Sequence, residues 1–140
     1  MKTNKIIIGG LVGGVAFFLL GWIIYGMVLM SFLMENQNQC AMRSMEDMIW
    51  WSLILSNFVW ALAYSVIFSW SNITGFAAGL KAGFIIGLLV STSVDLSFYS
   101  FTTMYSNLTA IAADVAASTV MSAIGGGVIA WVMGMGKKEA

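Results

Sequence analysis

The chain has 140 residues, of which 60% are hydrophobic and only 9% are charged, and its formal net charge is zero. Soluble domains usually carry about 25% charged residues, so this composition predicts a membrane protein whose first partner is the lipid bilayer. The balanced charge argues against nucleic-acid binding. The chain has no histidine and one cysteine, Cys40, so we expect no metal, no cofactor and no intramolecular disulfide.

The first predicted element is an apolar run over residues 6–33, which follows Lys2 and Lys5. About 20 residues cross a hydrocarbon core, so this run is long enough for one tilted transmembrane helix. A secretory signal peptide is the alternative, but the run is longer than the apolar region of a signal and offers no clear small-x-small cleavage site. Gly9 and Gly13 form a GxxxG pair near its start, a spacing typical of close helix packing.

The second transmembrane helix is predicted over residues 48–70. It follows a hydrophilic segment, residues 35–47, which we expect to be a loop or a short surface helix. Trp50, Trp51 and Trp70 lie near the two ends of the predicted helix, as tryptophans do in the aromatic belts of membrane interfaces. This pattern supports a complete crossing.

The third transmembrane helix is predicted over residues 74–101 and has two different faces. Glycine recurs every four residues on one face, which favours close helix packing within or between subunits. These residues are Gly75, Gly79, Gly83 and Gly87. The roughly opposite face contains Lys81 and Asp95, which are about 21 Å apart along the helix. Lys81 is therefore expected to reach cytoplasmic headgroups rather than to pair with Asp95.

The fourth transmembrane helix is predicted over residues 108–133, after a turn over residues 102–107. The expected fold is all-α: one domain over residues 1–140 with four antiparallel transmembrane helices. Lysines flank both ends of the chain, so the positive-inside rule predicts that both termini are cytoplasmic. The residues that give this signal are Lys2, Lys5, Lys137 and Lys138.

Polar residues from all four helices are expected at one depth. Counted from the outer helix ends at 1.5 Å per residue, four side chains lie about 10 to 13 Å below the outer surface. They are Tyr25, Asn57, Asp95 and Asp114. Ser91 and Thr92 lie one turn deeper than Asp95. Ser118 lies one turn from Asp114.

This layer predicts a ligand- or ion-binding site. An aspartate at the bilayer centre costs about 2.5 to 3.5 kcal/mol, and less toward the interface, so Asp95 and Asp114 are expected to face the interior. If close, the two carboxyl groups would share a proton, which suits a transporter or channel subunit for a proton, a cation or a small solute. Four helices leave little internal space, so we expect a homo-oligomer, a dimer or larger.

The alternative is a non-catalytic structural or accessory membrane protein. In that case the aspartates only hydrogen-bond to neighbouring polar groups, and the glycine faces hold helices or partners together. Enzymatic activity and catalytic residues are not predicted, because the sequence has no GxSxG, HExxH or phosphate-binding-loop motif. The segments SVDLS and AADVA also differ from the YD and GxGD motifs of intramembrane aspartyl proteases.

Two short motifs resemble those of a known family. LGWIIYG in the first helix and GGGVIAW in the last are similar to motifs of a domain-of-unknown-function family of small four-helix bacterial inner-membrane proteins. The resemblance spans most of the chain by layout. It implies the same four-helix fold and a multi-pass location in the bacterial cell membrane, with no established activity.

Overall fold

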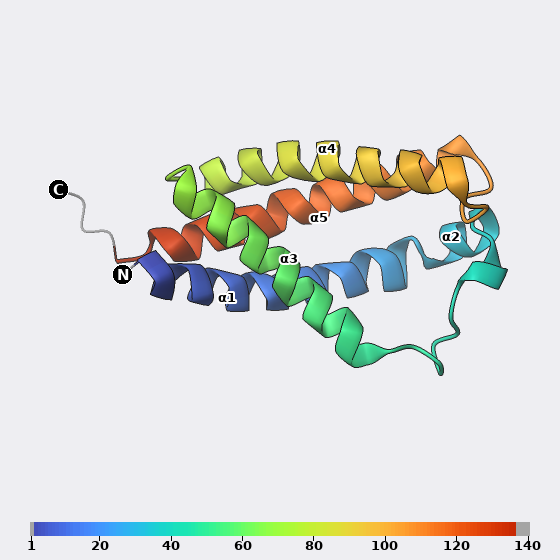
Figure 1. Ribbon diagram of the computed structural model, residues 1–140, viewed down its shortest axis with the longest axis horizontal. Helices are drawn as coiled ribbons and strands as arrows, with labels where there is room; N and C mark the ends of the chain where they lie inside the picture. Colours follow the sequence, from blue (N-terminus) through green and yellow to red (C-terminus); the bar gives the residue numbers. More distant parts are fainter. Residues whose placement is uncertain (1, 137–140) are drawn as a thin grey trace.

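The computed structural model describes residues 2–136, and they form helices joined by short connections (Figure 1). Four helices are long and apolar enough to cross a membrane, which confirms the predicted all-α class. They cover Thr3–Val28, Trp50–Trp70, Phe76–Phe101 and Leu108–Gly134. The described residues form no β-strand, only an isolated bridge between Gln37 and Tyr105. Lys137 and Lys138, used above for the orientation, lie outside the described residues.

The first crossing differs from the continuous helix expected over residues 6–33. α1 (Lys2–Ile23) continues into a π-helical turn, η1 (Ile24–Val28), and a separate short helix, α2 (Met30–Asn36), follows. The Leu29 N–H donates to the Ile24 carbonyl at 2.8 Å, and this hydrogen bond to the fifth residue back defines the π turn. Because a π turn holds one more residue than an α turn, it changes the direction of the side chains around it.

The hydrophilic segment contains one 3₁₀ turn, η2 (Gln39–Ala41), and leads to α3 (Trp50–Trp70). α3 ends in a Schellman motif, in which a residue with positive φ follows the helix. That residue is Asn72, with φ of 54°. The next N–H, from Ile73, donates to the Phe68 carbonyl at 2.9 Å. A short turn therefore connects α3 to the next helix.

The four long helices pack as two pairs (Figure 1). α4 (Phe76–Phe101) packs mainly on α5 (Leu108–Gly134), and α1 packs mainly on α3. Contacts between α1 and α5 join the pairs, and α5 is the most buried of the four. α3 runs obliquely, and its N-terminal end lies far from α4 in Figure 1. The two helices consequently share few contacts, although they are consecutive in the sequence.

Three of the predicted packing glycines of α4 contact α5: Gly79, Gly83 and Gly87. A methyl group added at Gly83, for example, would collide with the backbone carbonyl of Ser122. This part of the glycine stripe therefore packs within one chain. Gly75 differs, because it lies in the turn before α4 with φ of 90°, and an added methyl group there would meet nothing within 4 Å.

The glycine pair of α1 also packs inside the chain. A methyl group at Gly13 would collide with Ile129 of α5, and one at Gly9 would lie 2.8 Å from the Ser65 hydroxyl of α3. Phe17 continues this face and is completely buried. Its ring centroid lies 5.5 Å from that of Tyr64 in an edge-to-face arrangement. These contacts form the main core, at the junction of α1, α3 and α5.

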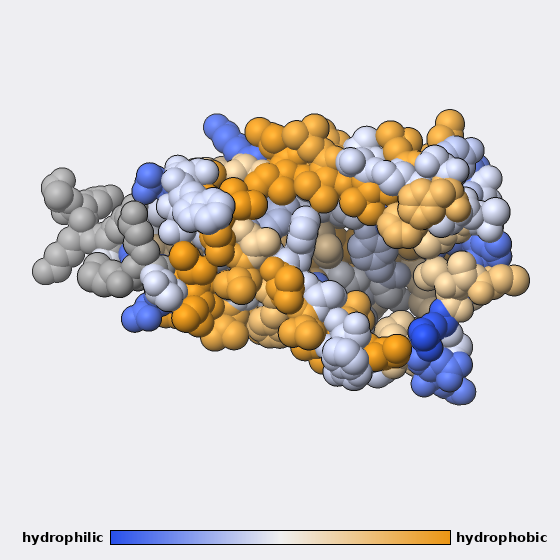
Figure 2. Space-filling model, viewed as in Figure 1, coloured by the Kyte–Doolittle hydropathy of each residue, from blue (hydrophilic) through white to orange (hydrophobic). Residues whose placement is uncertain are grey.

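The outer surface of the helices is largely apolar. Figure 2 shows apolar residues over the middle of one face and hydrophilic residues near its two ends. Trp51 and Trp70, at opposite ends of α3, are 71% and 79% exposed. Lys81 is exposed on α4. This distribution is consistent with a multi-pass membrane protein, in which lipid surrounds the apolar middle and tryptophans lie at the interfaces.

Candidate functional site

Two aspartates from different helices meet at one tyrosine hydroxyl. Asp95 lies in the last two turns of α4, and Asp114 lies in the second turn of α5. The hydroxyl oxygen of Tyr105 is 3.3 Å from Asp95 Oδ1 and 3.2 Å from Asp114 Oδ2. A hydroxyl carries one hydrogen, so it donates to only one of the two carboxylates at a time.

Tyr105 belongs to the connection between α4 and α5, and the chain after α2 holds this connection in place. The Asn38 N–H donates to the Met104 carbonyl at 2.8 Å, and a second backbone hydrogen bond of 3.0 Å follows in the same pairing. We call residues 36–38 and 102–107 together the clasp. Within the clasp Tyr105 is only 6% exposed, and its hydroxyl is directed at the aspartates.

Asn107 ties the clasp to the start of α5. Its side-chain oxygen accepts a hydrogen bond of 2.9 Å from the Ala110 N–H, as expected of a helix N-cap. Its Nδ2 donates to Asn36 Oδ1 at 2.8 Å. The beginning of α5, and with it Asp114, is therefore fixed relative to α2.

Tyr105 remains protonated at neutral pH and can act as a donor. Burial raises the pKa of its hydroxyl above the usual range, and the negative charges of Asp114 and Asp95 raise it further. An ordinary tyrosine already ionises only near about pH 10. The hydroxyl is therefore a fixed hydrogen-bond donor to the aspartate pair.

Tyr25 reaches the same region from the first crossing. Its hydroxyl lies 2.7 Å from Ser118 Oγ and donates to the backbone carbonyl of Asp114 at 3.4 Å. Tyr25 is part of the π turn η1, so the extra residue of that turn sets the direction of its side chain. π turns within longer helices are frequent at functional sites.

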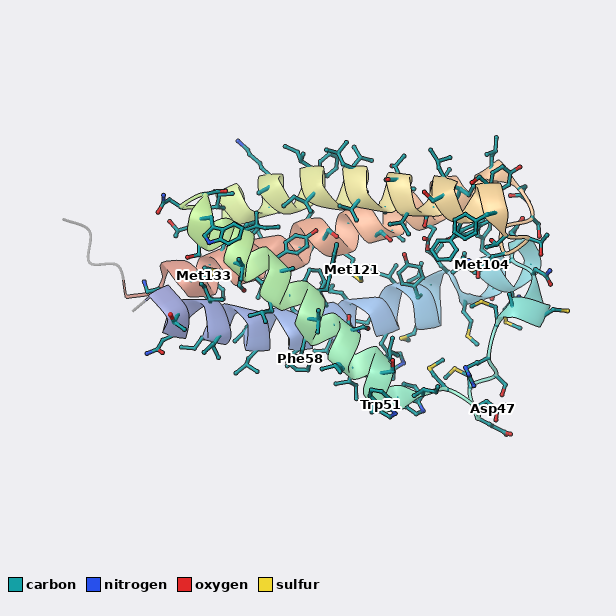
Figure 3. All side chains as sticks on the ribbon, in the orientation of Figure 1. Asp47, Trp51, Phe58, Met104, Met121 and Met133 are labelled. Atoms are coloured by element: carbon teal, nitrogen blue, oxygen red, sulfur yellow. The ribbon has the colours of Figure 1, made fainter. Side chains whose placement is uncertain are left out.

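A cavity of about 360 Å³ lies beside the aspartates, between α4, α5 and one residue of α3. Asp95, Asp114, Ser91 and Ser118 contribute polar groups to its wall. The large apolar side chains of the wall are Trp60, Val90, Val94 and Met121. Met121, labelled in Figure 3, lies between the two helix pairs, and Figure 2 shows this face hollowed there.

Asp95 holds an unused hydrogen-bond acceptor next to this cavity. The residue is 5% exposed, and its Oδ2 has no hydrogen-bond partner among the described residues. No lysine or arginine of the described part of the chain lines the cavity. A buried polar atom without a partner costs about 1 to 3 kcal/mol, so this oxygen is the least satisfied part of the site.

Two predicted residues lie outside the cluster. Asn57 Nδ2 donates to the Leu53 carbonyl of its own helix at 2.8 Å, and Asn57 does not line the cavity. Thr92 does not line it either. Ser91 does, but its hydroxyl donates to the Gly87 carbonyl at 2.6 Å. The structure therefore brings together Asp95, Asp114, Tyr25, Ser91 and Ser118, and leaves Asn57 and Thr92 apart.

The sequence analysis missed Tyr105 and Trp60. Depth was counted only along helices, and Tyr105 lies between two of them. A tyrosine in a short connection between two aspartate-bearing helices is a signal that would have identified it. Trp60 was visible as a neighbour of Asn57 on α3, three residues further along the same helix face.

The described residues contain no group of three or more histidine, cysteine, aspartate or glutamate side chains that would hold a metal ion. Calcium usually has six to eight oxygen ligands and structural zinc has four, so two carboxylates make an incomplete metal site. The chemistry of this wall is that of an anionic cavity with apolar sides.

No protein-family model, no curated protein and no solved structure matches this chain. The resemblance of LGWIIYG and GGGVIAW to a family of four-helix membrane proteins therefore stays a prediction. Any function must be argued from the geometry of the site.

Proposed function

We propose that this chain is a subunit of a small membrane transporter or channel, in which Asp95 and Asp114 handle a proton, a cation or a small solute. The four long apolar helices support a multi-pass membrane protein. We further propose that these helices are antiparallel, that both termini are cytoplasmic, and that the protein lies in the bacterial inner membrane, as the positive-inside rule and the family resemblance imply.

The observation that carries this proposal is the unpartnered Oδ2 of Asp95, a residue that lines the cavity. Asp95 is buried and Asp114 is partly buried. Their carboxylates share one hydroxyl donor and repel each other, and no basic side chain among the described residues of the wall compensates them. One proton held between the two carboxyl groups removes one negative charge and gives Asp95 Oδ2 a hydrogen-bond partner. A pair that holds a proton beside a cavity can release it when a cation arrives.

The test is a flux assay on the purified chain in liposomes. Asp95→Asn and Asp114→Asn should each lower proton-linked cation flux at least tenfold, because the amide cannot exchange a proton. Asp47→Asn is the matched control, since Asp47 lies in the exposed segment before α3 and hydrogen-bonds only Ser44. Equal elution on size exclusion shows that the variants fold. Undiminished flux in both variants would refute the proposal.

A structural role is the second candidate, and the hydrogen bonds around the pair favour it. Through Tyr105 and Tyr25, the clasp and the first crossing are both tied to α5. If this is the whole role, the wild-type chain supports no flux, and Asp95→Asn only changes the unfolding temperature. The liposome assay and a thermal unfolding scan of the same samples separate the two candidates.

The working unit is proposed to be a homo-oligomer. The cavity is walled by α4, α5 and only one residue of α3, and α3 shares few contacts with α4. One copy therefore leaves the cavity incompletely enclosed on this side, and a second copy would complete a path. Light scattering of the purified protein in detergent measures its mass, and a strictly monomeric, flux-competent chain would contradict this part of the proposal.

A further inference from the structure

We infer that the cavity beside Asp95 and Asp114 binds a small quaternary ammonium cation in exchange for the proton of the aspartate pair. The inference rests on the proposed function of this site and adds the chemical class of its substrate. It comes from the combination of an anionic end, apolar walls and a tryptophan in a single cavity.

The anionic end requires a positively charged ligand. Both aspartates line the cavity. Within residues 2–136 no lysine or arginine lines it, and the buried Asp95 Oδ2 has no hydrogen-bond partner. A neutral ligand would leave this arrangement unchanged. Two negative charges remain after the shared proton has left, and a monovalent cation restores the net charge of −1 that the pair carried with its proton.

The rest of the wall disfavours an inorganic ion. Small metal ions need several oxygen ligands, but apart from the two aspartates and the serine hydroxyls the wall is formed by apolar residues and glycine. Two of these hydroxyls also make hydrogen bonds within the protein: Ser91 donates to the Gly87 carbonyl at 2.6 Å, and Ser118 is hydrogen-bonded to Tyr25 at 2.7 Å. A cation without N–H groups, such as a quaternary ammonium, needs no further acceptors.

Trp60 gives the cavity a surface suited to such a cation. Tryptophan is the best aromatic partner for a cation–π contact, and quaternary ammonium groups are the ligands that aromatic sites commonly recognise. Trp60 is the one residue of α3 in the wall, and the other lining residues belong to α4 and α5, the helices that carry the aspartates. Val90, Val94 and Met121 would cover the methyl groups of the ligand.

The size of the cavity fits this class. Its volume of about 360 Å³ is at the small end of the range for ligand sites. The exchange balances in charge: the ammonium ion enters, one proton leaves the aspartate pair for water, and no covalent bond of the ligand forms or breaks. Binding should therefore be competitive with protons.

The test measures binding of choline to the full chain in lipid nanodiscs by calorimetry. Dimethylbutanol, in which carbon replaces the quaternary nitrogen, is the neutral isostere. We expect choline to bind at least tenfold more tightly than this isostere. We also expect about one proton to be released per choline, determined by repeating the titration in buffers of different ionisation enthalpy. Equal affinity for the two compounds, or no choline binding, overturns the inference.

A set of tryptophan variants locates the site. Trp60→Ala should weaken choline binding about three- to thirtyfold, the range of a cation–π contact, and Trp60→Phe should weaken it less. Trp131→Ala is the control, because Trp131 is 53% exposed on α5 and does not line the cavity. Binding that Trp60→Ala leaves unchanged would overturn the inference, provided that the variant elutes like the wild type on size exclusion.

The outcomes separate this inference from the proposed function. If Asp95→Asn abolishes proton-linked flux while choline does not bind, the substrate class is wrong and the proposed function stands. If choline binds and Asp95→Asn removes the binding, both are supported. If neither flux nor binding depends on Asp95, both fail.

Discussion

Tyr105 offers one hydroxyl hydrogen to two carboxylates, the buried Asp95 and the partly buried Asp114, and it lies in the connection between α4 and α5. Its position depends on the clasp, which holds its backbone by bonds to residues 36–38. Asp95 and Asp114 are thus linked through a residue whose location is set by a third part of the chain.

Tyr105→Phe should destabilise the protein, because it removes the hydroxyl donor that the two aspartates share. We expect the free energy of unfolding to fall by about 1 to 3 kcal/mol, the cost of leaving a buried acceptor without a partner. Chemical unfolding in mixed micelles, followed by circular dichroism, measures the change. Tyr99→Phe is the control, since Tyr99 is 42% exposed on α4.

A double-mutant cycle tests whether the aspartate is the reason. Combined with Asp114→Asn, Tyr105→Phe should cost less than it does in the wild type, because the two groups interact directly. If the two effects simply add, the destabilisation comes from packing of the ring. In that case the Tyr105 hydroxyl does not stabilise the aspartate pair.

Among the elements, the α4–α5 contact is the tightest. Gly83→Ala should lower the free energy of unfolding by about 1 to 3 kcal/mol, because the new methyl group would collide with the Ser122 carbonyl and force the helices apart. Gly21→Ala is the matched control. Its methyl group would lie 3.7 Å from Met121 Sδ, an ordinary contact, so its stability should be equal or slightly higher.

The same unfolding measurements decide the prediction. A Gly83→Ala variant as stable as Gly21→Ala would mean that α4 and α5 are not held in close contact in the folded protein. Proton-linked flux and ligand binding depend on the cavity, so they should change together with the α4–α5 contact. The reason is that Gly87, one turn further along α4, is part of the cavity wall.

The elements were more predictable from the sequence than the site. Long apolar runs bounded by polar turns mark a helix whatever its neighbours are, and α3, α4 and α5 begin and end within two residues of the predicted bounds. The break after α1 was not predicted, because residues 24–28 continue the apolar run and contain no proline that would mark it.

The site needed information that helix periodicity does not contain. Asn57 shared a predicted depth with the aspartates, yet depth does not set the direction of a side chain or the tilt of its helix. α3 runs obliquely, and Asn57 satisfies its amide on the Leu53 carbonyl. Tyr105 was missed because the pairing of residues 36–38 with the α4–α5 connection is a contact between distant parts of the chain.

For the whole molecule, the proposed orientation makes a prediction about Cys40. Cys40 is exposed in the segment between α2 and α3, which the proposal places outside the cytoplasm. A membrane-impermeant maleimide should therefore label it in intact spheroplasts. The chain contains no other cysteine, so Cys40→Ser gives the background.

A cysteine introduced between α3 and α4 tests the opposite side of the membrane. Ser71→Cys, made in the Cys40→Ser chain, places a thiol in the exposed turn between α3 and α4. This thiol should react only after the membrane is permeabilised. The reverse pattern, with Ser71→Cys labelled in intact spheroplasts and Cys40 protected, would invert the proposed topology.

The position of Asp95 next to Tyr105 and Asp114 also has a consequence for the order in which the helices enter the membrane during synthesis. Asp95 leaves the ribosome before both of its partners, since they lie further along the chain. Released into lipid alone, α4 would expose an aspartate at a cost of up to about 3.5 kcal/mol. α4 and α5 should therefore leave the insertion machinery together as a hairpin, and the chain becomes a bundle only when its last helix has been made.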